Sequence, residues 1–178
     1  AVSWNGRAFC HFKPSVRKRK LALLRKHLVS ASVAFLQEVH GDETEIRDLL
    51  HHEARVFEIF LSAHADRSSG GVVTLVRRDV LGYFDFPQSQ SLVDGRILRV
   101  SLLKDGCEVV LYNVHNFGLT PAQLHDVSSS LAHDVDAALA CPHECSLLVG
   151  GDFNFLPTGE VPLSLATPAT ITSCPAPA

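Results

Sequence analysis

The sequence has little of what marks membrane proteins and secreted proteins. No apolar run approaches the ~18 residues that span a bilayer, and the first residues lack the charged and apolar segments of a signal peptide. The five cysteines are odd in number and irregularly spaced, which argues against a disulfide framework. These absences predict a protein without a membrane span in a reducing compartment. We expect an intracellular location, with the nucleus as one candidate.

Methionine and an excess of positive charge are absent as well. Because translation begins with methionine and this chain begins with Ala1, we expect a further segment before it. The formal net charge is −3 at pH 7, so the chain does not coat nucleic acid by bulk charge. Contact with a polyanion would require a local basic patch or a bound cation.

What remains is the composition of a globular protein. The chain has 178 residues, of which 46% are hydrophobic and 20% charged, and this suffices for one domain with a hydrophobic core. No internal repeat or linker interrupts it before position 155, and we expect the domain to cover residues 1–156. Residues 157–178 are rich in Pro, Thr and Ala and predict a loose tail.

Short apolar runs alternate with helical patterns along this domain. Buried strands are expected at 32–36, 72–76, 97–102, 109–112 and 147–149, with 56–61 as a weaker candidate. A first helix is expected over about 16–29, with Ser15 as its cap and three leucines on one face (Leu21, Leu24 and Leu28). Asp42 and Glu45 predict the capping box of a short second helix.

The strongest start signal of a helix lies at Thr120-Pro121-Ala122-Gln123. Threonine suits the N-cap, proline the first helical position, and glutamine the third, where it completes a capping box. An apolar stripe then continues to about Ala140, carried by Leu124, Val127, Leu131, Val135 and Leu139.

Polar side chains follow several of the apolar runs. They are Asn5, Glu38, Asn113 with His115, and Asp152 with Asn154. Strand ends from one sheet system often come together, and loops there hold functional groups on a rigid scaffold. We therefore expect these residues to meet in one cleft.

Their residue types suit phosphodiester hydrolysis. The Glu38 carboxylate can bind Mg²⁺, which prefers oxygen ligands, and Asp152 can orient or deprotonate an attacking water. Asn5 and Asn154 can fix the metal, the water or a phosphate oxygen, and His115 can donate a proton to the phosphate. Taken singly, each has a structural interpretation, such as a solvated carboxylate, a turn or a backbone cap; the combination favours chemistry.

The same residues carry a resemblance to the endonuclease/exonuclease/phosphatase superfamily. The segments that resemble its motifs, in order, are Ser3-Trp4-Asn5-Gly6-Arg7, Leu36-Gln37-Glu38-Val39-His40, Gly70-Gly71-Val72-Val73, Gly95-Arg96-Ile97-Leu98-Arg99-Val100, Tyr112-Asn113-Val114-His115-Asn116 and Gly150-Gly151-Asp152-Phe153-Asn154. The Leu-Gln-Glu and Gly-Asp-Phe-Asn motifs in this order are the most specific. The first two segments look most like the endonuclease domains of non-LTR retrotransposons.

This resemblance implies a four-layered α/β sandwich, two facing mixed sheets flanked by helices, incomplete at the C-terminus. It implies hydrolysis of a phosphate ester with Mg²⁺, or Mn²⁺ as an alternative, and a nucleic acid, DNA first, as the partner. It assigns Asn5 and Glu38 to the metal, His115 to the phosphate, and Asp152 and Asn154 to the attacking water.

One departure from the family is large. The family ends its site with a further Asp and then an Asp-His pair, whereas no Asp or His follows Asn154 here. We therefore expect this chain to be a slow nuclease. The alternatives are a non-catalytic remnant or binding module that keeps the fold, and a phosphatase of the same superfamily.

Two other features have competing interpretations. The segment Cys141-Pro142-His143-Glu144-Cys145 suggests zinc, but its three ligands lie too close together for one metal, and a loop is favoured. The first helix is basic through Lys13, Arg17, Lys18, Arg19, Lys20, Arg25 and Lys26. It is either a solvated face or a contact for a nucleic-acid backbone, which would be salt-sensitive and blind to sequence.

Overall fold

The computed structural model describes residues 1–141 and 145–154. Their first part contains β1 (Val2–Asn5), α1 (Pro14–Leu28), β2 (Val33–Gln37), α2 (Glu43–Leu49), the 3₁₀ helix η1 (Glu53–Arg55), β3 (Phe57–Ser62) and β4 (Val72–Arg77). Their second part contains α3 (Arg78–Leu81), β5 (Phe86–Val93), β6 (Ile97–Lys104), β7 (Cys107–His115), α4 (Pro121–Ala140) and β8 (Cys145–Asp152). Every strand expected from an apolar run is present.

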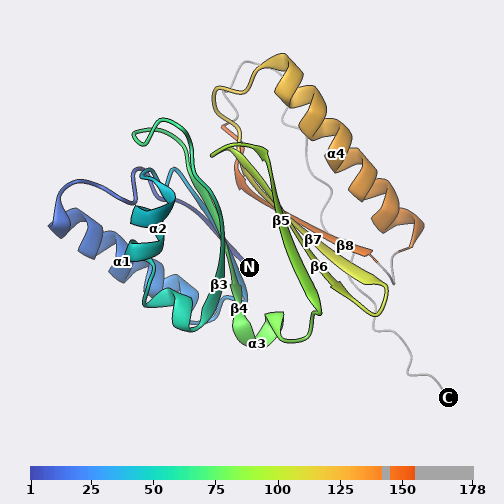
Figure 1. Cartoon of the computed structure of the whole chain (residues 1–178), viewed down its shortest axis with the longest axis horizontal. Helices are drawn as coiled ribbons and strands as arrows, with labels where there is room; N and C mark the ends of the chain where they lie inside the picture. Colours follow the sequence, from blue (N-terminus) through green and yellow to red (C-terminus); the bar gives the residue numbers. More distant parts are fainter. Residues whose placement is uncertain (142–144, 155–178) are drawn as a thin grey trace.

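The strands form two four-stranded sheets that face each other (Figure 1). The strand order is β1-β2-β4-β3 in the first sheet and β5-β6-β7-β8 in the second. Helices α1 and α2 cover the outer face of the first sheet, and α4 covers that of the second (Figure 1). The four layers confirm the α/β sandwich expected from the sequence.

Three apolar layers hold these elements together. The layer between the sheets consists of Phe35, Val72, Val76, Leu98, Val100, Leu102 and Leu111. One outer layer joins the first sheet to α1 and α2, and the other joins the second sheet to α4. Strand β2 is apolar on both faces because Ala34 and Leu36 face the helices while Phe35 faces the other sheet. A strand that is covered on both sides reads as a continuous apolar run.

Each sheet contains one parallel pair of strands joined through a helix. In the first sheet α1 connects β1 to β2, and in the second α4 connects β7 to β8. The remaining neighbours are antiparallel. Because both strands of a parallel pair end at the same edge of their sheet, the last residues of β1 and β2 lie side by side, and so do those of β7 and β8.

Local sequence signals account for most helix boundaries. Both predicted capping boxes, at the starts of α2 and α4, are confirmed. The predicted cap at Ser15 is wrong, because α1 begins at Pro14 and Lys13 occupies the N-cap without a side-chain hydrogen bond. Proline has the backbone angle of the first helical turn and lacks an N–H that would need a partner there, so it extends the helix back.

The sequence did not predict β5. Its residues include a proline and a polar run, and its first six are exposed. As the edge strand of the second sheet, β5 pairs with one neighbouring strand only. Few of its side chains are buried, so it does not need an apolar run.

Some predictions fall where the structure gives no description. The predicted tail at 157–178 and the central residues of the zinc alternative, Pro142 to Glu144, lie outside the described residues. Within them, Cys141 and Cys145 form no disulfide. No helix among residues 1–141 and 145–154 has the length and apolar character to cross a membrane.

Candidate active site

The last residues of β1, β2, β7 and β8 meet where the two sheets face each other. Asn5 ends β1 beside Gln37, and Glu38 follows directly. His115 pairs with Asp152 at the ends of β7 and β8. The Asn5 amide Nδ2 donates a hydrogen bond of 2.6 Å to Asp152 Oδ2, which links the two sheets. Side chains 147 positions apart in sequence are therefore in contact.

Glu38, His115 and Asp152 form a compact cluster. Each offers one ligand atom, and these atoms all lie within 4.8 Å of one another. The Oε1 atom of Glu38 is 3.3 Å from Nε2 of His115. Two carboxylates this close together can bind one oxygen-liganded cation, whose positive charge would offset their repulsion.

Asp152 is held through both of its oxygens. Oδ2 accepts the bond from Asn5, and Oδ1 accepts a 3.1 Å bond from the backbone N–H of Asn154. These donors, the Asn5 amide first, lower the pKa of Asp152 below its ordinary value. The carboxylate is therefore ionised at neutral pH and can accept a hydrogen bond or a proton from a water molecule.

Asn154 is beside this carboxylate but is less constrained. Its backbone is left-handed, with φ of +45°, a conformation that asparagine tolerates better than most residues. Its side chain is exposed.

A groove passes beside Asn154 and is lined by Ser3, Asn5, Arg7, Gln37, Gly151, Asp152, Phe153 and Asn154. Of the five candidate residues, Glu38, His115 and Asp152 thus form one cluster, Asn5 contacts it through Asp152, and Asn154 adjoins Asp152 at the groove.

His115 is almost wholly buried, with 1% of its surface exposed. Nη1 of Arg96 is 2.8 Å from its Nδ1 atom. Burial first, and the Arg96 charge second, lower the pKa of His115 below its ordinary value. Nε2 faces Glu38 but lacks hydrogen-bond geometry with it, and no other described residue bonds this atom. A ligand bound beside Glu38 and Asp152 would therefore find a ring nitrogen that has no other partner in the described part of the chain.

Glu38 is placed by an unusual backbone conformation. Its φ is +52°, in the left-handed region where a residue with a side chain costs ~1–3 kcal/mol. Its carbonyl accepts hydrogen bonds from the N–H groups of Ala8, at 2.8 Å, and Phe9, at 3.3 Å. These bonds from the loop after β1 hold the strained residue in place and turn its carboxylate toward the second sheet.

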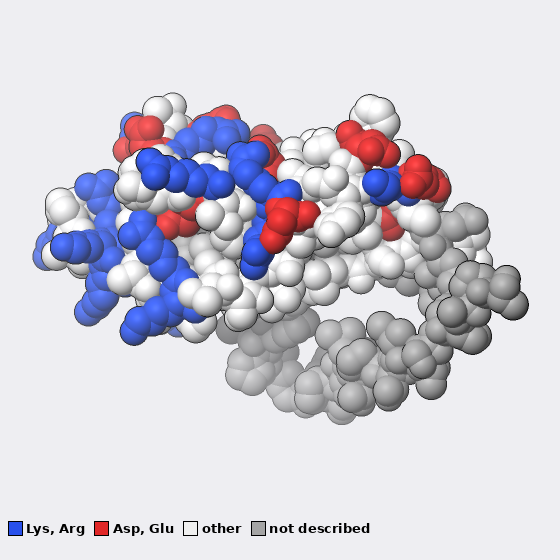
Figure 2. Space-filling model, turned by 90° about the horizontal axis from the view of Figure 1, so that it is seen from below, with Lys and Arg blue, Asp and Glu red and all other residues white. Residues whose placement is uncertain are grey.

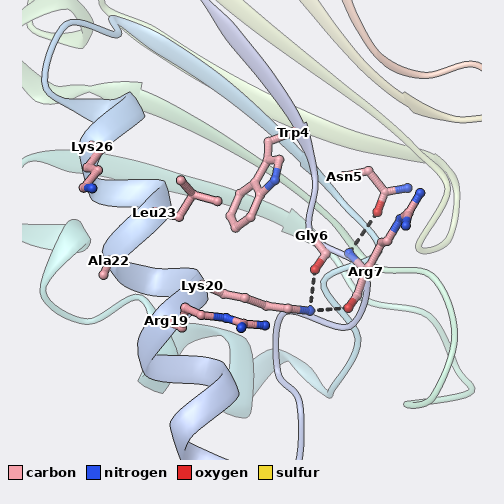
Figure 3. A pocket seen from close by; sticks show the side chains of 9 residues that line it. All are labelled: Trp4, Asn5, Gly6, Arg7, Arg19, Lys20, Ala22, Leu23 and Lys26. Atoms are coloured by element: carbon pink, nitrogen blue, oxygen red, sulfur yellow. Dashed lines mark hydrogen bonds between the residues drawn. The ribbon is translucent and has the colours of Figure 1, made fainter.

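Lys20 of α1 fixes that same loop. Its ammonium group donates to the carbonyl oxygens of Gly6, at 2.7 Å, and Arg7 (Figure 3). It also donates to the carbonyl oxygen of Ala8, at 3.0 Å. Partial burial is the main cause that lowers the pKa of Lys20. A groove of about 560 Å³ begins at Asn5 and continues between β1 and α1, where Trp4 and Leu23 face each other (Figure 3).

The segments Gly70-Gly71 and Gly95-Arg96 connect the backbone near Glu38 to His115. Val39 N–H donates to Gly71 O at 3.0 Å, and Gly71 N–H donates to Gly95 O at 2.9 Å. Gly95 has φ of +66°, and a Cβ atom there would lie 2.4 Å from Cβ of His64, so only glycine fits. The next residue is Arg96, which contacts His115. One chain of hydrogen bonds thus crosses from the first sheet to the second.

Asn113 was predicted to follow a strand, but it lies inside β7 and points between the sheets. It is fully buried, and its Oδ1 accepts a 2.8 Å hydrogen bond from Nε2 of Gln37. Its Nδ2 donates to the carbonyls of Val73, at 2.9 Å, and Leu36, at 3.2 Å. This side chain joins the sheets directly beneath the cluster, and an asparagine inside an apolar run is the sequence signal for it.

Comparison with known proteins is consistent with this geometry. Residues 2–171 match the profile of the Endonuclease/Exonuclease/phosphatase family. The chain belongs to this family. No curated protein sequence matches it.

Solved structures share the family fold with this chain at low sequence identity. TDP2 from Caenorhabditis elegans is 19% identical, with a TM-score of 0.56, over 87% of this chain and 47% of that one. D. rerio TDP2 complexed with a single-strand DNA product is 17% identical, with a TM-score of 0.55, over 87% of this chain and 60% of that one. A variant of the 3' phosphatase NExo from Neisseria, bound to a product DNA hairpin, is 16% identical, with a TM-score of 0.52, over 88% of this chain and 58% of that one. The chain thus spans about half of the length of these structures.

The cluster fits the divalent cation that the family implies. Glu38 and Asp152 supply carboxylate oxygens, the ligands that Mg²⁺ and Mn²⁺ prefer. The cluster is partly open to solvent, since both carboxylates are only half-buried. Asn5 contributes differently from expectation, because its oxygen already accepts a 2.9 Å bond from Arg7 N–H. A contact from Asn5 to the cation would use the second lone pair of that oxygen.

Proposed function

We propose that the chain is a divalent-metal-dependent phosphodiesterase that hydrolyses nucleic acid, with DNA as the expected substrate. The observation that carries this proposal is the cluster of Glu38, His115 and Asp152, with ligand atoms within 4.8 Å of one another at the ends of paired strands. Membership of the family supports the reaction class, and two of the similar structures hold a DNA product.

Each residue of the cluster has a separate role in this proposal. Glu38, with Asn5 and Asp152 beside it, would hold Mg²⁺ or Mn²⁺, and that cation neutralises charge on the phosphate and its leaving oxygen when bound. The ionised Asp152 accepts a proton from the attacking water, which Asn154 helps to orient. His115 Nε2 donates a hydrogen bond to a phosphate oxygen.

The finer assignment is an endonuclease of the retrotransposon type. It is supported by the resemblance of the segments 3–7 and 36–40 to non-LTR retrotransposon endonuclease domains. An endonuclease cuts within a strand, so a closed circular plasmid should be nicked, whereas an enzyme that acts only on strand ends would leave it intact.

Glu38→Gln should remove divalent-cation binding. The substitution keeps the size of the side chain but removes the charge that attracts the cation. Titration with Mn²⁺, followed by electron paramagnetic resonance, should show weak binding to the wild-type chain and a loss of at least roughly tenfold in the variant, since even outer partners of a metal ligand contribute about that much.

Glu43→Gln is the matched control, because Glu43 is exposed on α2 and pairs with Arg47 away from the cluster. It should bind Mn²⁺ like the wild type. Equal binding by Glu38→Gln, with an unchanged circular dichroism spectrum, would contradict the assignment of Glu38.

Hydrolysis should be measured under single-turnover conditions, with the protein in excess over fluorescent DNA. We expect cleavage that depends on Mg²⁺. Cation and DNA binding without any cation-dependent cleavage would favour the alternative of a non-catalytic binding module.

The basic face of α1 supports a polyanionic substrate. Helix α1 contains no Asp or Glu, and Figure 2 shows Lys and Arg gathered at the side where α1 lies in Figure 1. Arg25 pairs with Glu53, and Lys20 binds backbone carbonyls. The side chains of Lys18, Arg19 and Lys26 are exposed.

Replacing Lys18, Arg19 and Lys26 together by Gln should weaken DNA binding and reduce its dependence on salt. Each lost phosphate contact lowers the slope of log K against log salt by about 0.9 for duplex DNA. Fluorescence anisotropy in EDTA isolates this effect from the cation site. Lys104→Gln, on β6 of the other sheet, is the control, and an unchanged slope in the triple variant would favour a merely solvated helix.

A further inference from the structure

The two ring nitrogens of His115 face neighbours of opposite hydrogen-bonding character. Nδ1 is 2.8 Å from Nη1 of Arg96, and Nε2 is 3.3 Å from Oε1 of Glu38. A guanidinium group can only donate hydrogen bonds, and an ionised carboxylate can only accept them. The Arg96 hydrogen bond therefore requires Nδ1 to be an acceptor, which places the ring proton on Nε2, and the carboxylate of Glu38 beside Nε2 favours the same arrangement.

The opposite ring orientation does not satisfy these neighbours. A 180° rotation would place Cδ2 against the Arg96 guanidinium and Cε1 toward Glu38. Neither carbon accepts a hydrogen bond, so the buried Arg96 would lose its acceptor on the ring. The described orientation is the one that gives the guanidinium a partner.

Arg96 is itself rigidly placed. Only 8% of its surface is exposed, and Nη2 donates a 2.9 Å hydrogen bond to Oγ of Ser69. Its carbonyl accepts a 2.8 Å bond from the backbone N–H of His115. The ring of Phe117 lies 5.7 Å from its guanidinium carbon and stacks on His115 at 6.2 Å. Backbone, hydroxyl and aromatic contacts thus fix the guanidinium against Nδ1.

We infer that Arg96 is a positioning residue that fixes His115 as an Nε2–H donor and so keeps the ring from acting as a cation ligand. A nitrogen that carries a proton has no lone pair for a metal, and histidine binds metals only through its unprotonated nitrogen. Of the three groups in the cluster, the carboxylates of Glu38 and Asp152 then hold the cation. The inference rests on the proposed function in taking the cluster to bind a cation, whereas the position of the ring proton follows from the contacts of His115 alone.

The tautomer can be read directly by nuclear magnetic resonance. In protein labelled with ¹⁵N-histidine, protonated and unprotonated ring nitrogens resonate at well-separated frequencies, and the His115 signals are those missing in His115→Gln. We expect protonated Nε2 and unprotonated Nδ1 in the wild-type chain without metal. Protonated Nδ1 would overturn the inference.

Two substitutions test whether Arg96 is the cause. Arg96→Met keeps the length of the buried side chain but removes the donor, so the His115 signals should shift toward a mixture of both tautomers. Arg96→Lys restores one donor and should restore the Nε2–H form. A pure Nε2–H signal in Arg96→Met would show that another group positions the ring. If Arg96→Met fails to fold, the wild-type and Arg96→Lys spectra still decide the tautomer.

Cation binding provides a second and independent readout. His115→Gln should bind Mn²⁺ with an affinity on the order of the wild-type value, whereas Glu38→Gln should lose at least roughly tenfold. An equal loss in both variants would make His115 a ligand and overturn the inference. If the wild-type chain binds no Mn²⁺, the proposed function fails, and the resonance experiment still decides the position of the proton.

Discussion

Asp152→Asn is expected to reduce Mg²⁺-dependent DNA cleavage by ~10²–10⁴-fold, the usual contribution of a general acid–base group. The amide has the shape of the carboxylate, so its oxygen can still accept the hydrogen bond from Asn5. What the variant lacks is the negative charge and the capacity to take a proton from water. A loss of this size brings cleavage close to the background of the assay.

Binding measurements separate the possible causes of such a loss. DNA affinity in EDTA should not fall, because the substitution removes a negative charge that repels the phosphate backbone. Mn²⁺ titration then shows how far Asp152 also serves as a ligand. The control is Asp126→Asn, an exposed position on α4, which should cleave like the wild type. Cleavage by Asp152→Asn at the wild-type rate would mean that another residue activates the water.

Asp134→Ala is expected to destabilise the fold by about 3–5 kcal/mol, the cost of removing one partner from a buried ion pair. Asp134 is the buried residue of α4, and its oxygens accept bonds of 2.8 and 3.0 Å from Arg99. The Tyr112 hydroxyl donates a further bond of 2.7 Å. The hydrogen bonds from Arg99 and Tyr112 lower the pKa of Asp134 against the effect of burial, so the carboxylate is ionised.

Alanine at this position would leave the Arg99 charge with Glu108 alone, at 3.3 Å, inside the layer between α4 and the second sheet. For a chain of this size the change corresponds to a fall in melting temperature of roughly 6–20 °C. Thermal unfolding followed by circular dichroism measures it, with Asp136→Ala on the exposed face of α4 as control. Equal melting temperatures for the two variants would show that α4 is held by its apolar contacts alone.

The role of Asp134 also shows where periodicity misleads. The predicted stripe on α4 gave the helix correctly, and Val127 and Leu131 pack on the second sheet. Leu124 and Leu139 belong to the same stripe, yet they are 41% and 75% exposed. A stripe of apolar residues indicates that a helix is amphipathic, but it does not indicate how much of that face a particular sheet covers.

The candidate site likewise contains residues that sequence motifs select and residues whose role only the tertiary contacts reveal. Glu38, Asp152, Asn154, Asn5 and His115 could be selected from the sequence because each follows or ends an apolar run within a specific motif. Arg96 and Asn113 could not be given a role in this way. Their importance lies in contacts across the sheets, Arg96 with His115 and Asn113 with Gln37. Sequence motifs list the residues of a site without stating which of them touch.

By itself, the sequence determined most strands and helices and the chemical types of the candidate site residues. Apolar runs indicate strands because burying apolar side chains stabilises the fold. Capping boxes indicate helix starts because they satisfy free N–H groups, and carboxylates and amides indicate oxygen ligands. Tertiary structure alone decided the unpredicted edge strand β5, the bond between Asn5 and Asp152, and the partners of the two nitrogens of His115. These depend on how two sheets are packed, and packing sums many weak contacts between residues far apart in the chain, which no local pattern records.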